Sequence, residues 1–230
     1  MKATLIIFFL FSGILSFAQT DVFEKTVDFK NKRIDIDAEL VDKIEVTNWA
    51  QDKVAVQVTY SINDGALNNL LEVSLDETAS RIRLDVEFDD KKIDIDGFYD
   101  CDEERALTWG RKGERTRVCL DVKIEVKLPA NAELDIESVI GDLFIEGYYK
   151  ELHAKTVTGD IVLEWPEDQG AELEIKTVNG SIFTNHNFQP KQEKGLPLIS
   201  AHEVAGNLGN GGKFVTLETV TSDIYFKRSK

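Results

Sequence analysis

The chain has 230 residues, with 42 acidic and 27 basic side chains and a formal net charge of -15 at pH 7. Binding to nucleic acid or to an anionic membrane surface depends on lysine and arginine, so this charge argues against both partners. Hydrophobic residues make up 42% of the chain, which is enough for a packed core and excludes a wholly disordered protein. The length permits one domain or two small ones.

The N-terminal segment has the features of an export signal. A positive charge at Lys2 precedes an apolar run from Ala3 to Phe17, which is too short to span a bilayer comfortably. The run ends in Ser16-Phe17-Ala18, the small, bulky, small pattern of a signal peptidase site. We predict a signal peptide over residues 1–18 and an exported product that is periplasmic, associated with the outer membrane, or extracellular. A retained N-terminal anchor is the alternative, and no later segment is apolar enough to be transmembrane.

Export gives the two cysteines a structural meaning. Cys101 and Cys119 are the only pair in the sequence, and an oxidising compartment favours a disulfide between them. In the chain-entropy model such a bridge would stabilise the fold by about 3 kcal/mol. Two buried free thiols are the alternative.

Apolar and charged residues alternate along much of the N-terminal half. This period of two is typical of strands in a sheet with one solvated face, so most of the acidic charge is interpreted as that face. A short helix is considered only at Ala66–Leu71. We predict an all-β fold that begins with an antiparallel N-terminal β section over residues 19–129. The clearest alternating runs are residues 34–36, 44–46, 54–58, 82–88 and 122–128.

Beyond Pro129 a short motif recurs. Each copy ends a strand at a valine, turns on Gly or Ser followed by Asp, Asn or Ser, and restarts at Leu or Ile. Glycine tolerates positive φ, and short polar side chains hydrogen-bond the backbone of tight turns. The five copies occupy residues 138–143, 156–161, 177–182, 203–208 and 219–224. We predict their turns at Gly141, Asp142, Gly159, Asp160, Gly180, Ser181, Gly206, Asn207, Ser222 and Asp223.

Repetition at this spacing is typical of a β-solenoid, in which rungs stack and equivalent residues form columns. We predict a β-solenoid of about five short rungs over residues 130–230. The five valines would form one interior column, and the Leu and Ile residues after the turns would form another. An antiparallel meander with recurrent hairpin turns is the alternative.

The serial Thr-Val-x-Gly-Asp-Ile motifs resemble those of the putative-adhesin family of exported bacterial envelope proteins, a domain of unknown function. The similarity includes the runs Ile44–Asn48 and Lys53–Val58 and extends from about Ile34 to Phe226. The resemblance implies an all-β, solenoid-like envelope protein with no catalytic residues to transfer. Two features differ from the family pattern: the first unit, placed at Asn48-Trp49, lacks the Gly-Asp or Gly-Ser turn, and the segment between the cysteines is long.

A basic segment with a tryptophan lies between the cysteines of this otherwise acidic chain. Trp109 is followed closely by Arg111, Lys112 and Arg115. Because tryptophan and arginine are often central to interfaces, we predict that these four residues contact an envelope protein or a glycan. The alternative is that Trp109 packs back on the sheet while the basic residues pair with nearby glutamates.

Patterns that would bind an ion or a cofactor are incomplete. Lys92 occupies the first ligand position of a calcium-loop-like segment, and Phe214 occupies the hydroxyl position after Lys213 of a phosphate-loop-like segment. The three histidines are widely spaced. We therefore predict no metal and no cofactor. The alternative is a calcium site in the acidic segment that contains Asp94, Asp96, Asp100, Asp102, Glu103 and Glu104.

These observations favour a non-enzymatic, exported, adhesin-like structural or interaction protein of the cell envelope. A solenoid enzyme acting on polysaccharide is the alternative, since such enzymes place carboxylates near Lys or Arg on adjacent rungs. The rung acids Asp142, Asp160 and Asp223 fall at predicted turns instead. A role in envelope stress is a third hypothesis, which the residues do not distinguish from the first.

Overall fold

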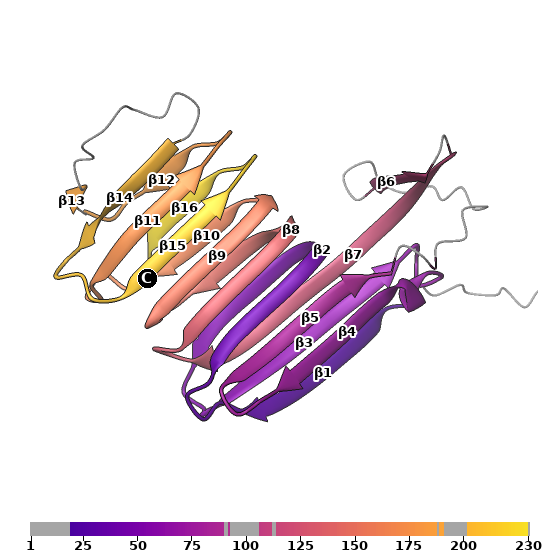
Figure 1. Cartoon of the computed structure of the whole chain (residues 1–230), viewed down its shortest axis with the longest axis horizontal. Coiled ribbons are helices and arrows are strands. Elements are labelled where there is room, and N and C mark those ends of the chain that lie inside the picture. Colours follow the sequence, from indigo (N-terminus) through magenta and orange to yellow (C-terminus); the bar gives the residue numbers. More distant parts are fainter. Residues whose placement is uncertain are drawn as a thin grey trace, which may run out of the picture.

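A computed structural model describes residues 19–89, 92, 106–111, 114–187, 189–190 and 202–229, and it is all-β, as predicted (Figure 1). The predicted signal peptide lies outside the described residues. The strands are β1 (Asp21–Asp28), β2 (Arg33–Trp49), β3 (Lys53–Ile62), β4 (Leu71–Glu77), β5 (Arg81–Phe88), β6 (Ala106–Arg111), β7 (Glu114–Pro129), β8 (Glu133–Glu146), β9 (Glu151–Thr158), β10 (Ile161–Trp165), β11 (Ala171–Thr177), β12 (Ile182–Thr184), β13 (Gln189–Pro190), β14 (His202–Leu208), β15 (Phe214–Thr219) and β16 (Ile224–Arg228).

The strands form two layers that face each other across one hydrophobic core (Figure 1). The long strands β2 and β8 belong to both layers, because their first and second halves pair with different neighbours. We call the ladder β4-β5-β2-β8-β9-β15-β11-β14-β13 the first layer and the ladder β1-β3-β7-β2-β8-β10-β16-β12 the second layer. In the first layer β2 and β8 contribute their first halves, and in the second layer their second halves.

Parallel strands form the centre of each layer and antiparallel strands lie towards the ends. In the first layer the run from β5 to β11 is parallel, and in the second layer the run from β7 to β12 is parallel. The predicted antiparallel N-terminal section is therefore only partly correct, since β2 pairs in parallel with β5, β7 and β8. Parallel pairing needs long connections between the paired strands. Neighbouring strands of a layer, such as β2 and β8, are therefore far apart in the sequence.

The repeated motifs stack in an order that differs from their order in the sequence. β9 pairs with β8 on one side and with β15 on the other, and β15 in turn pairs with β11. The last unit of the chain, β15 with β16, therefore lies between β9–β10 and β11–β12. The parallel pairs exclude an antiparallel meander for these units. The predicted five-rung solenoid in sequence order is not what the strands form.

The fourth predicted unit is not a rung. β14 runs antiparallel to β11, with Gly206 opposite Leu173 and Asn207 opposite Glu172. The predicted turn at Gly206 and Asn207 is therefore wrong, since both residues lie inside a strand. The local motif is the same as in the other units, but pairing with a strand that runs the other way extends the backbone through it.

The repeated valines lie on the outside, so the predicted interior valine column is wrong. Side chains alternate along a strand, and the inward positions Leu134 and Ile136 are followed by Ser138. The inward column consists of hydroxyl residues that are at most 7% exposed, namely Ser138, Thr156, Thr177 and Thr219. The outward valines Val139, Val157, Val178 and Val220 are between 37% and 48% exposed. After the turns, Leu143, Ile161 and Ile224 are fully buried, in the second column that was predicted.

The core is continuous from one end of the sandwich to the other. Inward residues of both layers, such as Ile44, Ile124, Leu163 and Ile175, are 0% exposed and belong to one cluster. Each such side chain contributes roughly 1.5–3 kcal/mol by leaving water. Where a short helix was considered, the structure has one 3-10 turn at Asn68–Leu70. In the part of the chain that the structure describes, no helix has the length and apolar character needed to cross a membrane.

Candidate functional site

The turn acids of the repeat tie neighbouring units together at the corners between the layers. The Asp142 carboxylate accepts a hydrogen bond from the Asp160 amide at 2.8 Å, and the Asp160 carboxylate accepts one from the Asp223 amide at 3.0 Å. The Asp223 carboxylate then accepts one from the Ser181 amide at 2.8 Å. These acids continue the backbone ladder around each corner, so their role is structural.

Buried hydroxyls make the matching contacts to carbonyl groups. Thr219 donates to the Gly159 carbonyl at 3.2 Å, and Thr177 donates to the Ser222 carbonyl at 2.9 Å. A Cβ atom on Gly159 would overlap the carbonyl of Gly141, so glycine is required there by the close approach of two chains. The threonines were not among the predicted site residues. Their alternation with the inward Leu and Ile residues was the signal that could have identified them.

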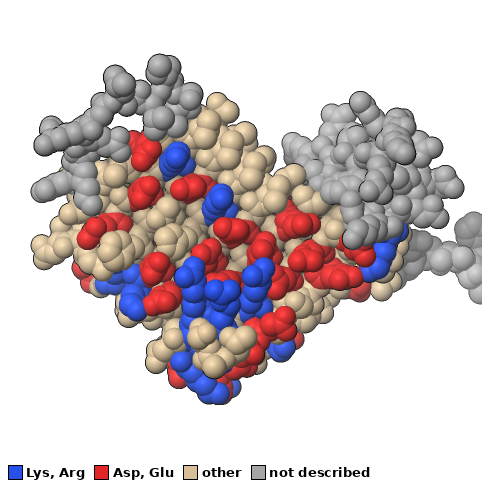
Figure 2. All heavy atoms as spheres, in the orientation of Figure 1, with Lys and Arg blue, Asp and Glu red and all other residues tan. Residues whose placement is uncertain are grey.

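The outer face of the first layer has a cluster of arginines and aspartates on β5, β2 and β8 that form ion pairs with one another. Arg33 and Arg81 both pair with Asp35, and Arg33 also reaches Asp135. Arg83 pairs with Asp37 at 3.1 Å and with Asp85 at 2.7 Å. Burial alone would lower the pKa of Arg33, but hydrogen bonds to Asp35 and Asp135 raise it above its ordinary value. Figure 2 shows basic groups set among acidic ones over this face.

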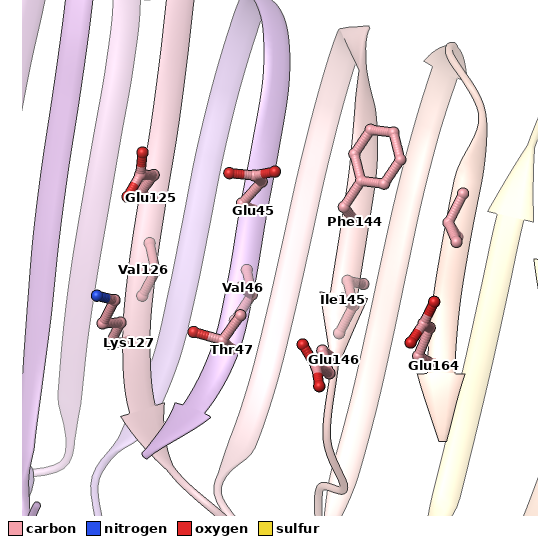
Figure 3. Close-up of a pocket in the computed structure, with 11 residues that line it drawn as sticks. Glu45, Val46, Thr47, Glu125, Val126, Lys127, Phe144, Ile145, Glu146 and Glu164 are labelled. Atoms are coloured by element: carbon pink, nitrogen blue, oxygen red, sulfur yellow. The ribbon is translucent and has the colours of Figure 1, made fainter. Parts of the chain in front are cut away.

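The outer face of the second layer contains a groove of about 310 Å³ across β7, β2, β8 and β10 (Figure 3). Its side chains form two rows that cross the strands. In one row Glu125 lies opposite Glu45, and Glu45 lies opposite Phe144. In the other row, β8 places Glu146 opposite Glu164 of β10. The remaining lining residues are Val46, Thr47, Val126, Lys127, Ile145 and Val162.

This groove has an excess of negative charge. It is lined by four glutamates and one lysine. Lys43 pairs with Glu45 and lies 4.7 Å from the centre of the Phe144 ring. Within the described part of the chain, Glu125, Glu146 and Glu164 form no ion pair. Like charges directly opposite each other destabilise a sheet, and at about 5 Å in water each pair costs somewhat less than about 1 kcal/mol.

The row that contains Phe144 continues as an apolar strip to the edge strand β12. Val162 lies opposite Phe144 and Tyr225, and Tyr225 lies opposite Phe183. The Phe183 and Tyr225 rings are stacked with centres 5.0 Å apart, and Phe183 is 48% exposed. Loss of hydration and the nearby Asp223 carboxylate raise the pKa of Tyr225, whose hydroxyl is 3.3 Å from that carboxylate.

A second hollow of about 220 Å³ adjoins the groove on the side of β1 and β3. It shares Glu125 and Lys127 with the groove and adds Glu24, Gln57 and Trp49. The Trp49 indole is held by a hydrogen bond from Nε1 to the Lys53 carbonyl at 2.7 Å. We call the two hollows together with the strip Phe144, Val162, Tyr225 and Phe183 the trough.

The predicted contact segment lies on a hairpin. Trp109 and Arg111 belong to β6, and Arg115 belongs to β7, with Arg111 opposite Glu114. Only the backbone is described there, and Lys112 lies outside the described residues. Cys101 and the acidic residues from Asp94 to Glu104 also lie outside them, so the disulfide with Cys119 and the calcium alternative stay predictions. In the described residues there is no group of three or more His, Cys, Asp or Glu side chains suited to a metal ion.

No protein-family model matches the sequence, and no curated protein matches it. Among solved structures, the fold resembles that of "a putative cell adhesion protein" from Clostridium sporogenes ATCC 15579, with a TM-score of 0.55, 12% identity, and coverage of 92% of this chain and 100% of that one. A "putative adhesin" from Bacteroides fragilis NCTC 9343 matches 91% of this chain and 97% of its own, with a TM-score of 0.26 and 12% identity. Another "putative adhesin", from Parabacteroides merdae ATCC 43184, matches 92% and 97% with a TM-score of 0.24 and 9% identity.

At 12% identity the likeness to the first of these structures shows a shared fold over almost the whole of both chains. The predicted resemblance to adhesin-like proteins is therefore supported at the level of the fold.

Proposed function

We propose that this chain is an exported, non-enzymatic, adhesin-like protein of the cell envelope, and that it attaches through the trough to an extended polymer. The observation that carries the proposal is the trough itself, which combines three glutamates that form no ion pair within the described residues, Glu125, Glu146 and Glu164, with an apolar strip that ends in the exposed ring of Phe183. The fold that the chain shares with a structure described as "a putative cell adhesion protein" is consistent with the same function.

The trough suits a long ligand because it runs across the strands. Its side chains lie in register on β1, β3, β7, β2, β8, β10, β16 and β12. At about 4.8 Å between neighbouring strands, these eight strands span roughly 34 Å. Hydrogen-bonded strands hold the side chains in place before the ligand arrives, which reduces the entropy lost on binding.

The apolar N-terminal segment supports export. The hairpin of β6 and β7, which has several basic residues, is proposed as a second contact. Trp109, Arg111, Lys112 and Arg115 are proposed as that contact, because their charge is opposite to that of the trough. One partner could then be held at two surfaces of different chemistry.

The test compares two exposed phenylalanines on opposite faces. Phe183 in the trough is 48% exposed, and Phe214 on the first layer is 54% exposed. Mature protein with Phe183→Ser should bind isolated envelope fractions about fivefold more weakly than the parent, since a partly buried aromatic contact is worth roughly 1 kcal/mol at an interface. Phe214→Ser should bind as the parent does, and both variants should keep its melting temperature within a few degrees.

Equal binding of the Phe183 and Phe214 variants would contradict the trough as the contact. A separate double variant, Trp109→Ala with Arg111→Ala, tests the hairpin. This variant should bind envelope fractions more weakly than the parent and keep the parent's melting temperature. Turnover of cell-wall or plant polysaccharides by the parent protein would overturn the non-enzymatic part of the proposal.

A further inference from the structure

We infer that the occupant of the trough is an extended polypeptide segment rich in lysine or arginine, contributed by a partner protein. This inference rests on the proposed function and names the chemical class of the ligand. The similarity of the fold to a solved structure gives no information on the ligand.

The first argument is charge complementarity. Four glutamates and one lysine line the groove, and Glu24, Lys25 and Gln57 extend the polar surface through the adjoining hollow. There the Lys25 ammonium donates a hydrogen bond to the Leu75 carbonyl.

Glu45, which pairs with Lys43, lies opposite Glu125, and Glu146 lies opposite Glu164, which has Lys227 opposite it on β16. Glu125 and Glu146 are thus the members of these pairs with neither an ion pair nor a lysine opposite them in the described part of the chain. A cation placed between the members of such a pair relieves their repulsion, whereas an anionic chain adds to it. A neutral chain gains nothing from the excess charge.

The second argument is that rings of the apolar strip attract ammonium groups, as two of the chain's own lysines show. The strip ends in Phe183, whose ring is 48% exposed and offers a further face. The Lys43 ammonium lies 4.7 Å from the centre of the Phe144 ring, and the Lys227 ammonium lies 4.8 Å from that of Tyr225. Aromatic faces attract cations through their quadrupole, and the aliphatic part of a lysine side chain packs on apolar surface. Lysine and arginine therefore use both components of the trough, the carboxylates and the rings.

The third argument concerns the backbone of the bound segment. A peptide lying on the outside of a sheet needs hydrogen-bond partners other than strand edges. Thr47 lines the groove between Lys127 and Glu146, and Gln57 and Thr26 line the adjoining hollow. These neutral side chains can both donate and accept, which suits the alternating amide and carbonyl groups of an extended chain.

The experiment measures binding of eight-residue peptides to the mature chain, residues 19–230, by calorimetry. The probes are an alternating Gly-Lys peptide, the corresponding Gly-Ser and Gly-Glu peptides, and a neutral hexasaccharide of N-acetylglucosamine. The Gly-Lys peptide should bind at least about tenfold more tightly than any other probe, and its affinity should fall as salt is added.

Two matched double variants then locate the binding site. Glu146→Gln with Glu164→Gln removes one like-charged pair from the groove, and we expect the affinity for the Gly-Lys peptide to fall about tenfold. Glu87→Gln with Glu174→Gln removes the same charge from exposed positions on the first layer, and the affinity should change less than about twofold. An equal loss in both variants would show general attraction to an acidic protein and would overturn the inference.

The outcomes separate this inference from the proposed function. If Phe183→Ser weakens envelope binding while the Gly-Ser peptide or the hexasaccharide binds as well as the Gly-Lys peptide, the trough is the contact but its occupant is not a basic segment. If Phe183→Ser leaves envelope binding unchanged, the proposed function fails, whatever the peptides do.

Discussion

The outer faces of the two layers are built from the same alternating strands, yet they treat their carboxylates differently. On the first layer Asp35, Asp37 and Asp85 are held by arginines on the same or neighbouring strands. On the second layer Glu146 and Glu164 face each other without an ion pair in the described part of the chain. The comparison indicates that an acidic surface can be interpreted only after its ion pairs are counted. We expect the paired carboxylates of the first layer to stabilise the fold, and the proposed function assigns the unpaired carboxylates of the second layer to a ligand.

The largest expected effect concerns the corners that hold the two faces in register. Gly159→Ala places a Cβ atom against the Gly141 carbonyl in a backbone with φ of 145°. We expect a loss of more than about 3 kcal/mol in unfolding free energy, because the neighbouring backbone must move. Gly212→Ala is the control, since its φ is 104° but no atom lies within 4 Å of the added Cβ. It should cost about 1 kcal/mol, and urea unfolding of both variants measures the difference. Similar losses would mean that strain in φ, and not contact between corners, is decisive.

The next effect tests the neutralised face. The Asp35 side chain is 15% exposed and forms ion pairs with Arg33 and Arg81. Asp35→Asn removes the charge and keeps the shape, and it should destabilise the protein by about 1–2 kcal/mol. The loss should shrink as salt screens the parent. An unchanged denaturation midpoint would show that this network contributes nothing to stability.

A pH effect is expected at the end of the second layer. His186 follows β12, is 7% exposed and stacks on Phe226 with ring centres 4.4 Å apart. Burial lowers the pKa of His186. The unfolded chain therefore binds a proton at higher pH than the folded one, so stability is lost as pH falls below about 6.5 and through the lower folded value. His186→Phe keeps the stacking and should lose less stability than the parent between pH 7.5 and pH 5.5, as measured by melting temperature. An identical pH dependence in the two proteins would contradict a role for this imidazole.

The smallest effect has the opposite sign to that on the first layer. Glu146→Gln with Glu164→Gln removes a like-charged pair, and it should stabilise the protein by up to about 0.5 kcal/mol at low salt. The same urea titration that detects destabilisation by Asp35→Asn detects this gain. Destabilisation by the double variant would mean that the second face, like the first, uses its carboxylates to hold the fold.

Only part of the architecture can be predicted from the sequence, because local residue patterns do not specify which strands pair with each other. The corner at Gly159-Asp160 follows from residue chemistry that acts over a few positions. The repeat predicts Val157 in the core, but the alternation from Leu152 and Ala154 already places Thr156 there and Val157 outside. The strand at Gly206 has no such signal, since the same motif forms a corner or a straight strand according to the direction of the neighbouring strand.

The trough could not be predicted, although Gln57, Glu45 and Glu125 belong to alternating runs that predict strands. Glu45 and Phe144 are neighbours only because β2 and β8 pair in parallel, and Phe144 meets Val162 only because β10 pairs beside β8. An all-β chain, the alternation of its faces and the corners at Gly141, Gly159 and Ser222 follow from neighbouring residues and can be read along the chain. The order of the units, and whether an outward carboxylate meets an arginine, a ring or another carboxylate, depends on how the strands pair. Every contact across a parallel ladder joins residues far apart in the chain, so no local pattern contains it.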